Sequence, residues 1–428
     1  MNAPQLSLPA SLWAATAPAG PATPALAEDK QVDVAIVGAG YTGLSTALHL
    51  AAGGTRVCVL DAGEPGWGAS GRNGGQVIPG LKYDPDELRK QFGGERGDAL
   101  IEVVGNAADE VFDLIGRHGI DCDASRNGWV QPAASKAALR GIERRAEQWR
   151  RQGVAVELLD QAAVARRIGS SNYLGAWVDP RAGSLQPLSY ARGLARVATA
   201  RGACIHGHSR VTGLAREGSG WCLTTAQGFK ARAERVVLAT DGYTDDLWPG
   251  LRQTVIAANS FIIATRPLSP ELRESILPGG EVCSDARRLL LYFRKDAQGR
   301  LLLGGRGPFV EPSRQADWAL LERSLGSLFP QLAGVPIEYR WSGRVALTQD
   351  FLPHVHEPAP GVSILLGYNG RGVALSTALG RHLAARLSGR GEGFPFPVTR
   401  IRPIPFHGLQ RFYLGAGIAW YRLLDALL

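Results

Sequence analysis

The most constraining feature of this chain is a glycine-rich turn near its N-terminus, flanked by two apolar runs. The run 31–37 leads into Gly38-Ala39-Gly40-Tyr41-Thr42-Gly43, a helical pattern continues to Ala52, and a second apolar run, 56–60, ends at Asp61. This order predicts a strand, a helix and a second strand, the βαβ unit of a Rossmann-type α/β fold. The G-x-G-x-x-G spacing lets the backbone turn tightly, approach a pyrophosphate and pack closely against the strand. The free N–H groups and the dipole at the helix N-terminus favour the diphosphate.

Asp61 narrows the choice of dinucleotide. It lies 18 residues after Gly43, where a carboxylate accepts hydrogen bonds from ribose hydroxyls. A 2′-phosphate would place a second anion beside it, so the pattern favours FAD or NAD over NADP.

Two further glycine-rich segments favour a flavin. Gly66–Gln76 holds five glycines in eleven residues, which predicts backbone passing close to a ligand. Near the other end, the apolar run 362–366 enters Gly367–Val373, and a helical pattern continues to Leu387. A second helix N-terminus can stabilise the negative charge of a reduced flavin ring, which a nicotinamide does not require.

The order of the predicted elements indicates two interleaved domains. We expect a discontinuous α/β nucleotide-binding domain of Rossmann type and a second α+β substrate domain, built on a mainly antiparallel sheet. The expected ranges are an extended N-terminal arm over 1–30, the nucleotide-binding domain over 31–80, 187–250 and 346–428, and the substrate domain over 81–186 and 251–345. We expect Leu12-Trp13 of the arm to dock on the protein. For the apolar segment 412–428 we expect an amphipathic helix lying on the protein, and a membrane-surface helix is the alternative.

Composition restricts the partners and the compartment. The net charge is +8, but there is no run of basic residues and no nucleic-acid-binding motif, so we expect no nucleic acid as a partner. The five cysteines form no C-x-x-C pair, which favours neither a disulfide framework nor a zinc site and fits a cytoplasmic protein. No basic leader and no spanning apolar run occur, so we expect neither a secretory signal nor a transmembrane segment.

Together these motifs resemble the FAD-dependent D-amino-acid oxidase (DAO) superfamily. The resemblance rests on Val34–Gly43, Asp61, Gly66–Gln76, Val236–Tyr243 and Gly367–Gly380. Within the superfamily, the chain resembles the γ-glutamylputrescine oxidase branch at four segments: Val37–Ser45, Gly68–Gln76, Pro403–His407 and Tyr421–Asp425. This likeness covers nearly the whole chain from about residue 11, but it does not fix the substrate.

The resemblance implies that FAD lies between the two domains. It assigns contacts with FAD to the following residues: Gly38, Gly40, Tyr41, Thr42, Gly43, Asp61, Ala62, Gly68, Ala69, Ser70, Arg72, Asn73, Gly74, Gly75, Val211, Gly242, Gly370, Arg371, Gly372 and Val373.

Two departures from related sequences are informative. Some sarcosine-oxidase relatives attach the flavin through a cysteine shortly before a T-x-D stretch, or through a histidine after the second strand. This chain has Ser342-Gly343-Arg344 and Gly71-Arg72-Asn73 at these places, so we expect FAD to be held non-covalently. Those relatives also carry a lysine that holds the substrate carboxylate, where this chain has Ala374, which disfavours a small α-amino acid.

The resemblance therefore implies an FAD-dependent oxidoreductase acting on CH–NH or CH–NH2 donors. We expect oxidation of a γ-glutamylated polyamine or a related amine to an imine that hydrolyses to an aldehyde, with O2 reduced to H2O2 and a role in polyamine catabolism. The candidates for the substrate face are Tyr292, Trp341, Arg344 and Tyr368, with Arg294 beside them. The alternatives are a D-amino-acid dehydrogenase, an N-methyl amino acid oxidase and a non-catalytic flavin-binding subunit. We expect no metal site, because the pair His354 and His356 is only weakly suggestive.

Overall fold

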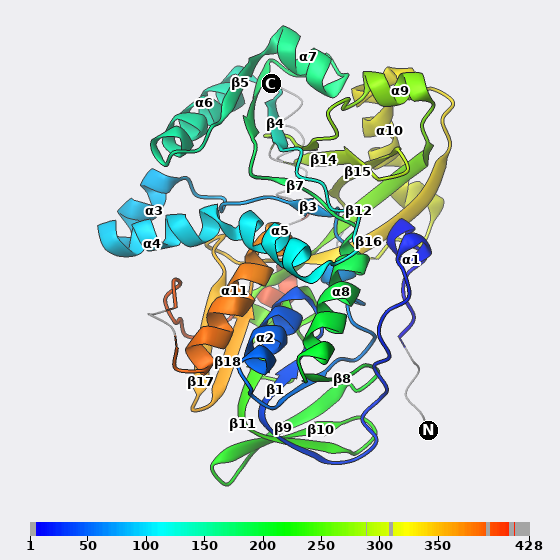
Figure 1. Ribbon diagram of the computed structural model, residues 1–428. Helices are drawn as coiled ribbons and strands as arrows, with labels where there is room; N and C mark the ends of the chain where they lie inside the picture. Colours follow the sequence, from blue (N-terminus) through cyan, green and yellow to red (C-terminus); the bar gives the residue numbers. More distant parts are fainter. Residues whose placement is uncertain (1–5, 288, 308–310, 391–393, 411–414, 416–428) are drawn as a thin grey trace.

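Two large sheets organise the molecule, one in the lower half and one in the upper half of Figure 1. The computed structural model describes residues 6–287, 289–307, 311–390, 394–410 and 415. The C-terminal helix expected over 412–428 lies outside the described residues apart from position 415. The fold is α/β, with a Rossmann-type domain and an α+β domain on a mainly antiparallel sheet, as predicted.

The first sheet has the order β17-β18-β11-β1-β2-β8, and β10 and β9 extend it from β11. Strands β18, β11, β1, β2 and β8 run parallel. The fully buried positions of β2 and β18 and of the C-terminal parts of β1 and β11 explain why these segments read as apolar runs. The bounds are β1 Lys30–Val37, β2 Val57–Leu60, β8 Cys204–His206, β9 Val211–Glu217, β10 Gly220–Thr225, β11 Lys230–Leu238, β17 His354–Ala359 and β18 Val362–Leu366.

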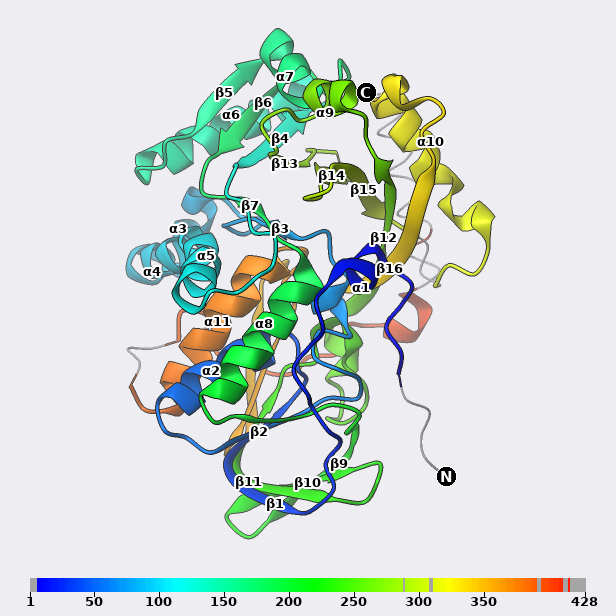
Figure 2. The ribbon, with the colours of Figure 1, turned by 45° about the vertical axis from the view of Figure 1, so that its right-hand side comes forward.

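Helices α2 (Tyr41–Ala52), α8 (Pro187–Ala200) and α11 (Gly372–Leu387) lie together on one face of this sheet (Figures 1 and 2). Helices α2 and α11 approach closely, since a Cβ atom on Gly380 would lie 2.8 Å from the Cβ atom of Ser45. This packing holds the N-termini of α2 and α11 on the same side of the molecule, because both helices follow parallel strands.

The second sheet has the order β16-β12-β15-β14-β13-β4-β6-β5, and all neighbours are antiparallel except β13 and β4. The bounds are β4 Trp129–Ala133, β5 Glu157–Asp160, β6 Gly175–Asp179, β12 Ile256–Pro267, β13 Val282–Ser284, β14 Leu291–Lys295, β15 Arg300–Arg306 and β16 Ile337–Leu347. Around it lie α6 Lys136–Arg151, α7 Gln161–Ile168, α9 Pro270–Ser275 and α10 Ala319–Leu328. A short pair, β3 (Gln76–Val77) and β7 (Gly183–Ser184), is separate from both large sheets.

Two regions add detail to the sequence prediction. The segment 85–118, which the sequence predicts to be mostly helical with a break at Gly93-Gly94, is divided into α3 Pro85–Phe92, α4 Gly94–Gly105 and α5 Ala107–His118. Gly93, with φ of 83°, produces the first break. The N-terminal arm, expected to be extended, contains one short helix, α1 (Leu12–Thr16), because Ser11 caps it by accepting a hydrogen bond from the Ala14 N–H group.

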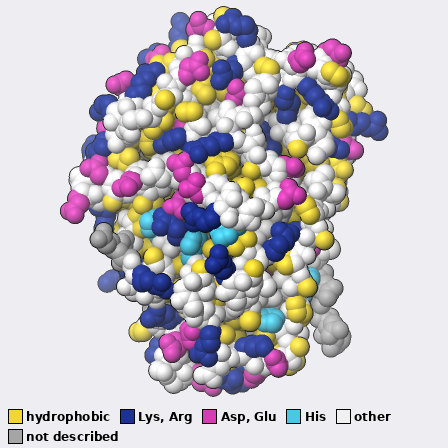
Figure 3. All heavy atoms as spheres, viewed as in Figure 1, with side chains coloured by type: hydrophobic (Ala, Val, Ile, Leu, Met, Phe, Trp, Pro, Cys, Tyr) yellow, Lys and Arg dark blue, Asp and Glu magenta, His cyan; other side chains and the backbone are white. Residues whose placement is uncertain are grey.

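The surface carries interspersed charges. On the face in Figure 3, basic side chains lie among acidic ones over the whole molecule. Most of the recorded ion pairs join an arginine to a nearby carboxylate at the surface, for example Arg56 to Asp33 and Arg386 to Glu357. No helix in the described part of the chain is long and apolar enough to cross a bilayer.

Candidate flavin and substrate site

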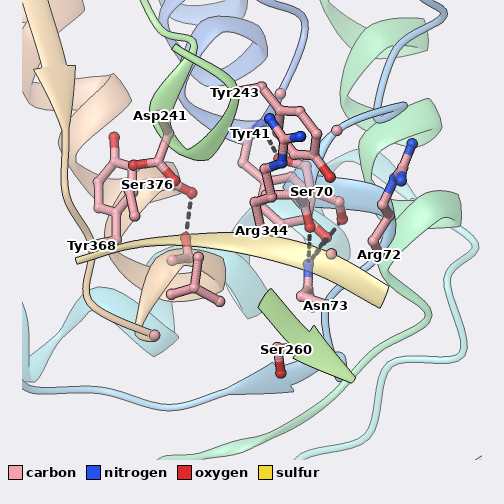
Figure 4. A pocket seen from close by; sticks show the side chains of 18 of the residues that line it. Tyr41, Ser70, Arg72, Asn73, Asp241, Tyr243, Ser260, Arg344, Tyr368 and Ser376 are labelled. Atoms are coloured by element: carbon pink, nitrogen blue, oxygen red, sulfur yellow. Dashed lines mark hydrogen bonds between the residues drawn. The ribbon is translucent and has the colours of Figure 1, made fainter. Parts of the chain in front are cut away.

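A cavity of about 790 Å³ lies between the two sheets. The first sheet contributes the carboxyl ends of its parallel strands, including Asp61 after β2 and Asp241 after β11. The antiparallel sheet contributes side chains such as Tyr292 of β14. Ligands of open parallel sheets bind at such carboxyl ends, so the cavity occupies the expected position. Figure 4 shows the side chains that surround it.

The first glycine turn has the geometry of a diphosphate cradle. Gly38 has φ of 107°, and a Cβ atom there would lie 2.7 Å from the Ala239 carbonyl oxygen. A Cβ atom on Gly43 would lie 1.9 Å from the Gly38 carbonyl oxygen. The Gly40 N-cap of α2 offers no side-chain cap, although the Tyr41 N–H group donates to Ser70 Oγ at 3.0 Å. The start of α2 therefore remains open toward the cavity for an anionic group.

Asp61 lies where the ribose of a dinucleotide is expected. Its carboxylate accepts hydrogen bonds from the Ala39 N–H group at 2.6 Å and the Gly63 N–H group at 2.8 Å. Burial raises the pKa of Asp61 to about 6, although these two N–H groups oppose the shift. An ionised carboxylate has about four acceptor positions, so ribose hydroxyl groups can still bind to it and favour the ionised form.

The loop Gly66–Gln76 is folded back on itself by its own side chains. Asn73 donates from Nδ2 to the carbonyl oxygens of Ala69 and Ser70, at 3.1 and 2.9 Å, and its Oδ1 accepts from the Gly75 N–H group at 2.8 Å. At Gly74 a Cβ atom would lie 2.7 Å from the Tyr292 ring. Gly74 is thus required by the close approach of the loop to Tyr292 of β14.

The second glycine loop brings another open helix N-terminus to the cavity. Helix α11 begins at Gly372 without a side-chain cap. The Asp241 carboxylate accepts the Gly367 N–H group at 2.8 Å, and burial raises the pKa of Asp241 to about 6. Tyr368 OH lies 2.5 Å from Thr42 Oγ1. The two glycine loops are therefore held together by a contact between buried side chains.

Three of the four substrate-face candidates line the cavity, namely Tyr292, Arg344 and Tyr368. Tyr292 OH lies 2.7 Å from Ser260 Oγ, and Arg344 pairs with Glu311 at 3.1 Å. The fourth, Trp341, is not among the lining residues: it is 2% exposed, and its ring packs edge-on against Trp13. Trp341 and Arg344 are three residues apart on β16, and such positions point to opposite faces of a strand.

Arg294 does not line the cavity either. Its guanidinium group donates to the carbonyl oxygens of Gly74 and Leu185, both at 2.7 Å. Burial lowers the pKa of Arg294 to about 10. It therefore supports the glycine-rich loop from behind instead of facing a substrate.

Most of the predicted cofactor residues line the cavity, and the exceptions are the glycines at 43, 75 and 242. Each of these three would place a Cβ atom against a neighbouring backbone oxygen, those of Gly38, Leu185 and Arg344. They are needed for close packing around the cavity. Sequence reasoning missed several lining residues of the strands and connecting loops, among them Gln131, Asn259, Ser284 and Arg306, because nothing in a strand pattern marks a lining position.

Outside the cavity, the histidine pair has ordinary partners. His354 Nε2 lies 2.9 Å from Asp350 Oδ1, and His356 Nδ1 lies 2.9 Å from the Thr399 carbonyl oxygen. Among the described residues there is no group of three or more His, Cys, Asp or Glu side chains arranged to hold a metal.

The cavity suits FAD because its donors and glycines are arranged for an extended dinucleotide with a ring at the domain junction. These features define a flavin-dependent oxidoreductase. Residues 33–386 match the family described as DAO, FAD dependent oxidoreductase. The chain belongs to this family, whose cofactor is FAD.

Two curated relatives extend the comparison. The chain is 35% identical over 415 residues to the gamma-glutamylputrescine oxidoreductase of Escherichia coli K12, which covers 94% of this chain and 95% of the relative. It is 34% identical over 423 residues to a probable oxidoreductase OrdL of Rhizobium meliloti, which covers 97% of both.

Solved structures agree on the fold. Glycine oxidase from Geobacillus kaustophilus superposes with a TM-score of 0.72 at 24% identity, covering 87% of this chain and 99% of that structure. L-proline dehydrogenase from P. horikoshii gives a TM-score of 0.70 at 18% identity, covering 86% and 96%.

Proposed function

We propose that this chain is an FAD-dependent amine oxidase whose substrate is an amine carrying a distant carboxylate, as in a γ-glutamylated polyamine. Two lines of support are the similarity to a gamma-glutamylputrescine oxidoreductase over 94% of the chain and Ala374 at the position where some relatives place a carboxylate-binding lysine. The observation that carries the proposal is that a buried guanidinium nitrogen of Arg371, which lines the cavity, has no hydrogen-bond partner among the described residues.

Arg371 is a half-buried cation near the carboxylates of Asp179 and Asp84, which favour its charged form. Within the described residues its Nη1 atom is buried and has no hydrogen-bond partner. The guanidinium carbon of Arg371 lies 4.5 Å from the centre of the Trp129 ring. Burial lowers the pKa of Arg371 to about 9, so the group is still charged at neutral pH. A buried cation is costly without a partner, and guanidinium binds a carboxylate through two parallel hydrogen bonds.

Two of the other arginines near this end, Arg145 and Arg344, are already paired. Arg145 donates from Nε to Asp84 at 2.6 Å and from Nη1 to Gln131 at 2.7 Å. Arg344 is paired with Glu311. Arg371, which the resemblance places among the FAD contacts, is therefore proposed to bind the α-carboxylate of a γ-glutamyl group instead, and Arg344 takes second place.

The reaction removes two hydrogens from the substrate. Bound FAD would supply the two-electron chemistry, taking a hydride from the carbon beside the amine nitrogen and passing both electrons to O2, which with two protons becomes H2O2. The resulting imine reacts with one water molecule to give an aldehyde and the released amine, which is ammonia when the substrate is the primary amine of γ-glutamylputrescine. The protein positions the amine and excludes water with the lining side chains Ile262 and Tyr292. The open N-terminus of α11 favours negative charge at the ring end.

The proposal is tested by anaerobic mixing of the FAD-loaded protein with γ-glutamylputrescine, putrescine, N-methylglycine and D-alanine. We expect γ-glutamylputrescine to bleach the visible flavin band fastest and putrescine to require a much higher concentration. Bleaching by D-alanine or N-methylglycine alone would replace the proposal by one of the amino-acid activities. No bleaching by any of them would favour a non-catalytic flavin-binding subunit.

The electron acceptor needs a separate measurement. We expect oxygen uptake and peroxide formation with the bleaching amine and no added acceptor. Turnover only with an added quinone would indicate a dehydrogenase.

A further inference from the structure

Three consecutive carbonyl groups of the glycine-rich loop Gly66–Gln76 (the cofactor loop) are each bound by a side chain from another element. The oxygen of Arg72 accepts from Trp341 Nε1 at 2.9 Å, that of Asn73 from Trp13 Nε1 at 2.8 Å, and that of Gly74 from Arg294 Nε at 2.7 Å. The three donors come from β16, α1 and β14. Segments from three distant parts of the chain thus fix three successive peptide units.

The three donors also contact one another. The Trp13 and Trp341 ring centres are 5.7 Å apart at an angle of 75°, and the Arg294 guanidinium carbon lies 5.0 Å from the centre of the Trp13 ring. All three residues are buried, with exposed fractions of 1%, 2% and 4%. Trp13 is the central member of this Trp13–Trp341–Arg294 cluster, because it contacts both of the others.

Trp13 is supplied by the N-terminal arm, which is tied down at several points. Its carbonyl oxygen accepts from Gln186 Nε2 at 3.0 Å, and Ser11 caps α1 through the Ala14 N–H group. Before α1, the Ser7 carbonyl oxygen accepts from Trp67 Nε1 at 2.7 Å, and Leu6 lines the cavity itself. The arm therefore runs along the cofactor loop and contacts it at both Trp67 and Asn73.

These hydrogen bonds also determine the direction in which the N–H groups of the same peptide units point. In a trans peptide the C=O and N–H groups point in opposite directions. With the carbonyls of Arg72 and Asn73 held by the cluster, the N–H groups of Asn73 and Gly74 are turned away from it, toward the cavity that both residues line. Glycines at 74 and 75 add no side chain that would restrict rotation, so the orientation of these peptide groups depends on the three donors together with the Asn73 side chain, whose Oδ1 accepts from the Gly75 N–H group.

We propose that the N-terminal arm is part of the FAD-binding apparatus, and that Trp13 is a positioning residue that holds the peptide groups of Asn73 and Gly74 toward the cofactor. The proposal rests on FAD as the cofactor and is independent of which amine is oxidised.

The test compares Trp13→Phe with a matched control in the full-length, FAD-loaded protein. Trp221→Phe is the control, because Trp221 is also buried and donates from Nε1 to a backbone oxygen, that of Pro360 at 3.0 Å. We expect Trp13→Phe to accelerate FAD dissociation about tenfold, which corresponds to about 1.4 kcal/mol, and to change the circular dichroism of the bound flavin. Trp221→Phe lowers thermal stability without either change.

Ser11→Ala provides a milder variant that retains Trp13. Loss of the cap loosens α1, and we expect FAD to dissociate about two- to threefold faster, since cap removal affects the arm only in part. If Trp13→Phe does not fold, Ser11→Ala decides the outcome. The proposal would be overturned if FAD dissociated from the arm variants that fold no faster than from Trp221→Phe, and if the circular dichroism of the bound flavin were unchanged.

Discussion

The two ends of the cavity are built in different ways. At the adenine and diphosphate end, one short stretch from Gly38 to Asp61 supplies the glycine turn, the open helix N-terminus and the carboxylate proposed to bind the ribose. At the ring and substrate end, the lining comes from β4, β12, β14, β15 and β16 and from the loop before α11. The first end works mainly through backbone groups that are close in sequence and the second mainly through side chains from separate elements, so the adenine end can be recognised locally and substrate choice depends on tertiary structure.

The largest effect is expected at the adenine end, from Gly43→Ala. Its Cβ atom would meet the Gly38 carbonyl oxygen at 1.9 Å, and neither backbone segment can move without opening the turn. We expect the purified protein to contain no FAD and its free energy of unfolding to fall by about 3 kcal/mol or more. Denaturant unfolding and FAD content after gel filtration measure both.

Gly141→Ala in α6 is the control for this prediction. A Cβ atom there has no heavy atom within 4 Å, so we expect normal FAD content and a gain of about 0.5–1 kcal/mol. Full FAD content in Gly43→Ala would show that the turn is not the diphosphate cradle.

Asp61→Asn should weaken FAD binding without abolishing the fold. Loss of hydrogen bonds to a charged acceptor costs about 1.5–3 kcal/mol, so we expect the FAD dissociation constant to rise about 10- to 100-fold. Equilibrium titration of the apoprotein with FAD measures it. An unchanged constant would show that Asp61 does not contact the ribose.

The same residue predicts a pH dependence. Burial raises the pKa of Asp61 to about 6 in the folded protein, above the usual value of about 3.9. Its contribution to apoprotein stability is therefore fully present below about pH 4 and is lost as the pH rises through about 6. Ribose donors favour the ionised form, so we expect FAD affinity to fall as the pH drops below about 6, and to fall less in Asp61→Asn.

At the substrate end, Arg371→Met tests the carboxylate anchor. We expect the apparent KM for γ-glutamylputrescine to rise about 10- to 100-fold, because a charge-assisted pair of hydrogen bonds is lost. Oxidation of putrescine, which has no carboxylate, should change by less than about threefold on the same grounds. If FAD affinity falls and both amines are affected equally, Arg371 contacts the cofactor instead of the substrate.

The smallest effect is expected where the two ends meet. Tyr368→Phe removes the contact with Thr42 Oγ1 and nothing else from the ring. A neutral hydrogen bond contributes about 1 kcal/mol, so we expect FAD affinity to fall a few-fold. Tyr190→Phe, which loses a longer contact of 3.3 Å with Thr377 Oγ1, is the control. Equal FAD affinity in the two variants would show that the link between the glycine loops is not needed for binding.

The same contrast explains what could be predicted from the sequence. The fold class and the first glycine turn were accessible because a strand, a turn and a helix adjacent in sequence are also adjacent in space. The Asp241 contact with the Gly367 N–H group joins residues 126 positions apart and has no local pattern. Likewise, the docking of Trp13 was predicted, but its hydrogen bond to Asn73 depends on how the arm crosses the loop.

The substrate-face candidates Trp341 and Arg344 show a limit of the sequence. Side chains three positions apart on one strand point to opposite faces. The sequence predicts a strand only over 337–341, whereas β16 continues to Leu347, so this rule could not be applied to the pair from the sequence. The position of Arg294 on its strand could not predict its role either, because its partners, the carbonyl oxygens of Gly74 and Leu185, lie far away in the sequence.

The division between the two ends is tested most directly by anaerobic flavin reduction with γ-glutamylputrescine in Asp61→Asn and Arg371→Met, each saturated with FAD. The account predicts that Asp61→Asn, once saturated, is reduced at the wild-type rate and with the wild-type dependence on substrate concentration. It predicts that Arg371→Met requires about 10- to 100-fold more substrate for the same rate. Slow reduction of saturated Asp61→Asn, or a wild-type substrate dependence in Arg371→Met, would contradict it.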